Sequence, residues 1–143
     1  MKYILYTDGG SRGNPGPAGI GVVIANENGE VLKKHGEAIG NTTNNEAEYQ
    51  ALIFGLKKLK QVFGKEAMKK SHLEIRMDSE LIVKQMNHQY KIAEPNLQKL
   101  FLQVWNLMLD FSQIKFVAIA RKQNKEADKL VNEALDARQE KLF

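Results

Sequence analysis

The chain opens with KYILYTDGGSRGNPGP, residues 2–17, and this stretch decides the fold. Residues 3–7 are mainly β-branched and aromatic and are followed by glycine and proline, which predicts a mostly buried strand that Asp8 ends. A carboxylate at the end of a buried strand is costly unless it is exposed or paired. Asp8 therefore either starts a turn through its own side chain or belongs to a metal or phosphate site. The second role needs further carboxylates at the same edge of the sheet.

Length and composition limit the class of protein. A chain of 143 residues, 43% hydrophobic and 27% charged, is typical of one soluble globular domain, so we expect a single domain over residues 1–143. No apolar run approaches the roughly 20 residues of a membrane span, and no signal-peptide pattern is present, which together predict a cytoplasmic protein. The absence of cysteine excludes disulfides, thiolate zinc sites and a cysteine nucleophile. The net charge of +4 permits a polyanionic partner without requiring one.

The order of the predicted elements indicates an α/β fold. The glycine-rich residues 9–19 match neither a dinucleotide fingerprint nor a P-loop, because prolines interrupt them and an apolar strand follows. That strand is expected to pair antiparallel with the first. Residues 64–71 are expected to form a solvated connection. The later strands are predicted at residues 20–25, 31–39, 73–77 and 114–120. Residues 40–45 break the strand pattern, and a long helix follows to about Phe63; further helices are predicted after Ser79, from Pro95 and after Asn124, a suitable N-cap.

The first helix separates the roles of two glutamates. Thr43 and Glu46 fit a capping box, which gives Glu46 a structural role. A leucine stripe that begins at Leu52 should face the sheet, and Glu48 lies one turn before Leu52 on that stripe. Glu48 is either a first-turn acid favoured by the helix dipole or an inward-facing carboxylate of a functional site. The sequence leaves both interpretations open.

Two more aspartates occupy similar places in the pattern. Asp78 follows the fourth strand as Asp8 follows the first. Asp128 lies in the first turn of the last helix, on the stripe that is expected to face the sheet. Trp105, just off the apolar stripe of the preceding helix, is expected to pack rather than to stack on nucleic-acid bases.

These four acids predict a metal centre. Strand ends and helix starts can meet at one edge of a mixed sheet, where four carboxylates without basic partners would raise one another's pKa unless divalent cations neutralise them. Hard oxygen ligands favour Mg²⁺ or Mn²⁺ over zinc. An all-carboxylate site suits two-metal phosphoryl transfer.

Four segments carry a family resemblance: TDGGSRGNPGPAG (residues 7–19), TNNEAE (43–48), MDSE (77–80) and RKQNKEAD (121–128). In order and spacing they resemble the catalytic segments of type 1 ribonuclease H, and the similarity covers nearly the whole chain. The resemblance implies a ribonuclease-H-like five-stranded mixed sheet, with its first three strands antiparallel, flanked by helices. It also implies endonucleolytic hydrolysis of the RNA strand of an RNA/DNA hybrid, leaving 5′-phosphate and 3′-hydroxyl ends.

Site residues follow by position from the resemblance. Asp8 would bridge two Mg²⁺ ions, for which Mn²⁺ could substitute, and Glu48, Asp78 and Asp128 would complete their shells. Backbone amides of the glycine-rich loop would face the 2′-hydroxyls that distinguish RNA from DNA. The implied substrate contacts are Gly9, Gly10, Ser11 and Arg12 in this loop, with Asn14, Asn44 and Asn45 at the minor groove.

The chain also departs from the family pattern. It resembles a short form without the N-terminal hybrid-binding module. Residues 85–95 are short where other members insert a basic protrusion, so weaker hybrid affinity is expected. The loop before Asp128 has no histidine, and Arg121 or Lys122 would replace it in contacting phosphate or releasing product. Glu80 stands where some members carry glutamine, which leaves double-stranded RNA open as a secondary substrate. We expect a monomer that contacts no membrane.

Two other functions fit the same fold. A non-catalytic hybrid-binding module should have lost one of the four acids, and none is missing. An integrase-like nuclease would act on DNA alone, against which the DGGS and TNN segments argue.

Overall fold

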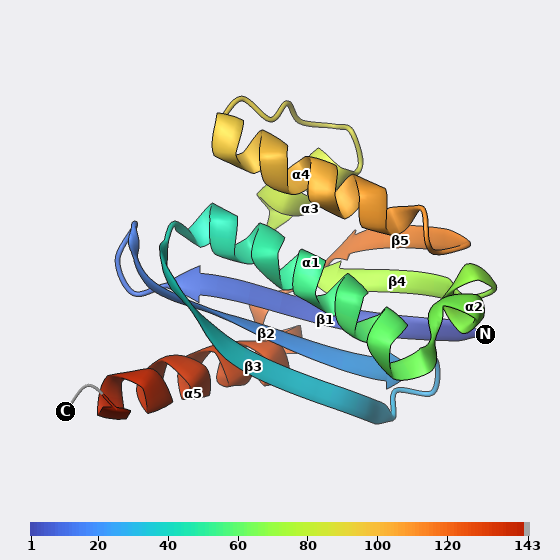
Figure 1. Cartoon of the computed structure of the whole chain (residues 1–143), viewed down its shortest axis with the longest axis horizontal. Coiled ribbons are helices and arrows are strands. Elements are labelled where there is room, and N and C mark those ends of the chain that lie inside the picture. Colours follow the sequence, from blue (N-terminus) through green and yellow to red (C-terminus); the bar gives the residue numbers. More distant parts are fainter. Residues whose placement is uncertain (142–143) are drawn as a thin grey trace.

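The protein is built on one five-stranded mixed sheet (Figure 1). A computed structural model describes residues 1–141. The strand order is β3-β2-β1-β4-β5; β1, β2 and β3 are antiparallel neighbours, and β4 and β5 run parallel to β1. The predicted ribonuclease-H-like sheet is therefore confirmed. The strands are β1 (Lys2–Ser11), β2 (Gly16–Asn26), β3 (Val31–Thr42), β4 (His72–Met77) and β5 (Gln113–Ala118).

Helices cover both faces of the sheet. In Figure 1, α1 and α4 lie on the near face, and α5 lies behind, where it packs on β2 and β3. None of the described helices is long and apolar enough to cross a bilayer. The helices are α1 (Asn44–Phe63), α2 (Lys65–Lys69), α3 (Glu80–Met86), α4 (Pro95–Met108) and α5 (Lys125–Lys141), with a 3₁₀ turn at Arg121–Gln123. A single domain over residues 1–143 stays a prediction.

The first strand is longer than predicted. Asp8 does not end β1, which continues to Ser11 because the glycines after Asp8 remain paired with β2. Gly9 is required there, since a Cβ would lie 2.3 Å from the carbonyl oxygen of Ala47 in α1. The close approach brings the start of α1 against the C-terminal part of β1. By contrast, β4 ends at Met77, so Asp78 follows it as predicted.

The structure changes two expectations about packing. Most of the connection at residues 64–71 is exposed, as predicted, but residues 65–69 form α2, whose Met68 is fully buried. Trp105 is 46% exposed on α4, so it is not a packed core residue. The core instead lies between the sheet and the helices α1, α3 and α4, around Leu5, Leu52 and Ile75.

Candidate active site

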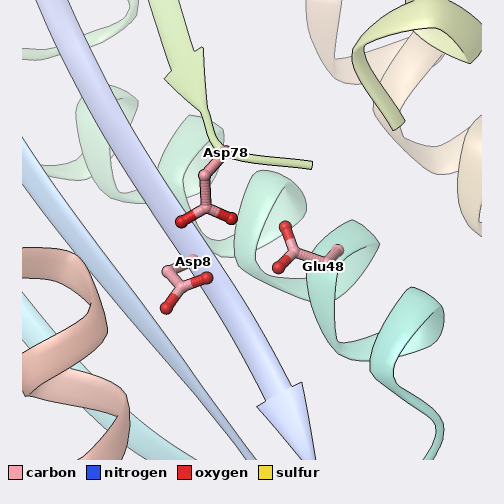
Figure 2. Close-up of side chains that lie close together, drawn as sticks. All are labelled: Asp8, Glu48 and Asp78. Atoms are coloured by element: carbon pink, nitrogen blue, oxygen red, sulfur yellow. The ribbon is translucent and has the colours of Figure 1, made fainter. Parts of the chain in front are cut away.

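Three carboxylates from three separate elements meet beside the central strand. Asp8 comes from β1, Glu48 from the first turns of α1, and Asp78 from the residue after β4. One carboxylate oxygen of each lies within 4.8 Å of the others. Figure 2 shows the three side chains turned toward a common space. We call Asp8, Glu48 and Asp78 the acidic cluster.

Local interactions fix Glu48 in the acidic cluster. Its side chain is 7% exposed, and its Oε1 accepts a hydrogen bond from the Gly9 backbone N–H at 3.2 Å. Glu46, two residues earlier, completes the predicted capping box with Thr43. The structure thus assigns the structural role to Glu46 and the inward position to Glu48.

The acidic cluster carries unfavourable negative charge. Burial raises the pKa of Asp8 from 3.8 to about 7, and the negative charges of Asp78 and then Asp128 add to this effect. Burial, followed by the charge of Asp8, also raises the pKa of Glu48 well above its usual value. Among the ion pairs within residues 1–141, none includes a member of the cluster. The carboxylates therefore lack a cationic partner from the described part of the chain.

Asp128 lies beside the acidic cluster rather than within it. It lines the same cavity, of about 440 Å³, and its charge acts on Asp8. However, Asp128 is exposed, and the buried stripe of α5 runs through Ala127, Val131 and Leu135. The prediction that Asp128 shares the sheet-facing stripe was wrong by one helical position. Its carboxylate is placed at the rim of the cavity.

Comparison with known proteins gives the family of the chain. Residues 6–134 match the family model described as reverse transcriptase-like. The solved structure of LC11-RNase H1 in complex with an RNA/DNA hybrid is 48% identical, with a TM-score of 0.92, over 96% of this chain and 99% of that one. The chain belongs to the type 1 ribonuclease H family. RNase H1 of Halobacterium salinarum, an archaeon, is 35% identical with a TM-score of 0.88 over 96% of this chain and 99% of that one.

Curated relatives support the same family assignment, but they are longer than this chain. The bifunctional protein Rv2228c of Mycobacterium tuberculosis is 42% identical over 96% of this chain and 36% of its own length. Ribonuclease HI of Halobacterium salinarum is 38% identical over 92% of this chain and 63% of its own length. This ribonuclease H family member thus spans about a third of the length of the curated relatives it matches first.

Most of the substrate contacts implied by the ribonuclease H resemblance line the cavity. Gly9, Gly10, Ser11, Arg12, Asn44, Asn45 and Arg121 all do so. Asn14 does not line it, but its Oδ1 accepts the Asn44 backbone N–H at 3.0 Å and so ties the β1–β2 loop to α1. Arg12 forms an ion pair with Asp136 of α5 at 2.7 Å.

Three backbone N–H groups of the glycine-rich loop bind other protein atoms, whereas the resemblance implied that they face the substrate. The N–H of Gly9 donates to Glu48, that of Ser11 to Asn44 Oδ1 at 2.8 Å, and that of Arg12 to the Pro17 carbonyl at 2.8 Å. These three amides hold the loop together and do not face outward. Substrate contact by these residues stays a prediction and would use their other atoms.

Sequence reasoning missed Asn124 as a residue of this site. Its side chain is 1% exposed and donates a 3.3 Å hydrogen bond to the Asp78 carboxylate. Its place four residues before Asp128 is a usable signal, but an asparagine directly before a helix also has the sequence preference of an N-cap. Among the described residues, Asn124 Oδ1 accepts no hydrogen bond, so the side chain does not cap α5.

Proposed function

We propose that the chain is an endoribonuclease that uses divalent metal ions to hydrolyse the RNA strand of RNA/DNA hybrids, leaving 5′-phosphate and 3′-hydroxyl ends. The observation that carries this proposal is the acidic cluster, three converging carboxylates without a cationic partner in the described chain. Membership of the ribonuclease H family supports it, as does similarity over 99% of a chain solved with an RNA/DNA hybrid.

The acidic cluster fits a divalent cation. Its donors are all carboxylate oxygens, which suit Mg²⁺ and Mn²⁺. Glu48 Oε2 is buried and accepts no hydrogen bond among the described residues, so it is available as a ligand. We propose that Asp8, Glu48, Asp78 and the rim residue Asp128 hold two Mg²⁺ ions, with Mn²⁺ as a substitute. When bound, such ions supply the Lewis acidity that phosphodiester hydrolysis requires.

The chain's own residues prepare the site for this chemistry. Asp8 lies in the central strand, where it pairs with Gly21 of β2, and the preceding residue, Thr7, pairs with Met77 of β4 as well, so the backbone that carries Asp8 is held in place. The Gly9 N–H orients Glu48 by binding one oxygen and leaving the other unpaired. Arg121 lies on the lining of the same cavity, where its positive charge can hold a substrate or product phosphate.

Strand-specific cleavage tests this proposal. We would incubate end-labelled RNA/DNA hybrid, double-stranded RNA and double-stranded DNA with Mg²⁺, with Mn²⁺ and with chelator. We expect cleavage of the hybrid's RNA strand that is lost with chelator and in Asp8→Asn. Glu66→Gln is the matched control, because it makes the same carboxylate-to-amide change on the exposed surface of α2.

Each other outcome has a definite meaning. Binding of the hybrid without cleavage under every metal condition would identify a hybrid-binding module. Cleavage of DNA would identify an integrase-like nuclease. Slower cutting of double-stranded RNA would support the secondary activity that we propose from Glu80, which is exposed at the start of α3 beside the cavity residue Ser79.

A further inference from the structure

Asn124 connects the segments that carry three of the four acids. Its Nδ2 donates to the carbonyl oxygen of Thr7, the residue before Asp8, at 2.9 Å. It also donates to Asp78 Oδ2 at 3.3 Å. Its backbone carbonyl accepts the Asp128 N–H at 3.1 Å, the first hydrogen bond of α5. One buried residue therefore contacts β1, the end of β4 and the start of α5.

The chemistry of the neighbours fixes how the Asn124 carboxamide is turned. Both groups in contact with Nδ2, a backbone carbonyl and a carboxylate, only accept hydrogen bonds, so the NH₂ end must face them. This orientation leaves Asn124 Oδ1 buried without a donor among the described residues. Buried polar atoms are normally paired, and an N-cap would have paired this one. The Asn124 side chain therefore binds Asp78 of the acidic cluster and does not cap the N-terminus of α5.

Asp78 needs such a restraint more than the other members of the acidic cluster. It follows the last residue of β4, it is only partly buried, and the negative charges of its neighbours repel it. Without the Asn124 amide, rotation of the Asp78 side chain toward solvent would separate it from Asp8 and relieve that repulsion. The hydrogen bond to Asp78 opposes this rotation, and the bond to the Thr7 carbonyl holds the Asn124 carboxamide in place; neither adds positive charge that would compete with a cation.

We propose that Asn124 is a positioning residue that holds Asp78 in the acidic cluster and anchors the helix start that carries Asp128. This inference rests on the proposed function, because it concerns the same metal centre. Residues that orient metal ligands through hydrogen bonds typically contribute about 10- to 100-fold to metal affinity. Loss of the Asn124 amide should weaken binding of the cation by a similar factor while the fold is kept.

Calorimetric titration with Mn²⁺ alone tests this role. We would compare wild-type protein with Asn124→Ala and with Asn124→Ser, which keeps a single donor. Gln85→Ala is the matched control: Gln85 is also a buried carboxamide, 5% exposed, but it binds Tyr49 and the Lys91 carbonyl, away from the acids. Circular dichroism melts establish that each variant is folded at the temperature of titration.

We expect the Mn²⁺ dissociation constant to rise about 10- to 100-fold in Asn124→Ala, less in Asn124→Ser, and less than about twofold in Gln85→Ala. Wild-type affinity in folded Asn124→Ala, or an equal loss in Gln85→Ala, would overturn the positioning role alone. If Asn124→Ala does not fold, Asn124→Ser decides in the same way. Failure of the wild-type protein to bind Mn²⁺ would overturn the proposed function and this inference together.

Discussion

Replacing Asp8 with asparagine should stabilise the metal-free protein while removing its activity. The ionised Asp8 carboxylate is buried next to Glu48 and Asp78 without a cation from the described chain. Asparagine has nearly the same shape and carries no charge, so it removes the repulsion without opening a cavity. A residue kept for metal binding is expected to cost stability when the metal is absent.

The size of the effect follows from the pKa of Asp8, which rises from 3.8 to about 7. At about 1.4 kcal/mol per pKa unit, the ionised group costs at most about 4 kcal/mol of unfolding free energy above pH 7. Glu48 shares this repulsion, so we expect Asp8→Asn to gain about 1–3 kcal/mol, or about 3–10 °C in melting temperature. Because the folded-state pKa is raised, the gain should be small below about pH 4, grow up to about pH 7 and stay constant above it.

Thermal melts followed by circular dichroism, in chelator and at several pH values from 4 to 8, measure this gain. Glu66→Gln on the exposed surface of α2 serves as the control and should melt like the wild type. A lower melting temperature for Asp8→Asn at pH 8, or a gain that does not depend on pH, would refute the account of the acidic cluster as a repulsive site.

Three further changes test the surrounding structure. Gly9→Ala places a Cβ 2.3 Å from the Ala47 carbonyl oxygen and should lower the free energy of unfolding by about 1–3 kcal/mol or more in denaturant titrations. Gly10→Ala, whose Cβ would have no atom closer than 3.9 Å, should cost much less. Equal losses in the two variants would contradict the close packing of α1 on β1. Glu46→Gln should lower the free energy of unfolding by up to about 1 kcal/mol through loss of the helix cap and should keep hybrid cleavage, whereas Glu48→Gln should lose cleavage. Similar activities of the two variants would overturn the assignment of Glu46 to the cap and of Glu48 to the acidic cluster. Mg²⁺ should raise the melting temperature more at pH 8 than at pH 5.5, because protons compete with the cation for the cluster, and the reverse order would argue against carboxylate ligands.

Local signals in the sequence were sufficient for most elements of the fold and for the inward position of Glu48. The capping box of Thr43 and Glu46 fixed the start of α1, and the phase of its leucine stripe placed Glu48 inward. These features depend on neighbouring residues in the chain. They could therefore be interpreted before the tertiary structure was known.

The parts that sequence did not predict depend on distant partners. β1 continues past Asp8 because Gly9 and the residues after it pair with β2, and no local pattern specifies that pairing. Asp128 lies one position off the buried stripe because the start of α5 packs through Ala127, whose carbonyl oxygen would lie 2.2 Å from a Cβ at Gly21. Asn124 has the local preference of an N-cap, but two acceptors from other elements compete successfully for its amide.

The most direct test of the account is anomalous diffraction from crystals of the protein soaked in Mn²⁺. The central claim is that divalent cations neutralise the acidic cluster. We predict anomalous peaks within ligand distance of Asp8, Glu48 and Asp78 in the wild type, and loss of these peaks in Asp8→Asn crystals of the same form. An acidic cluster without a peak, in crystals that show Mn²⁺ bound elsewhere on the protein, would contradict the account.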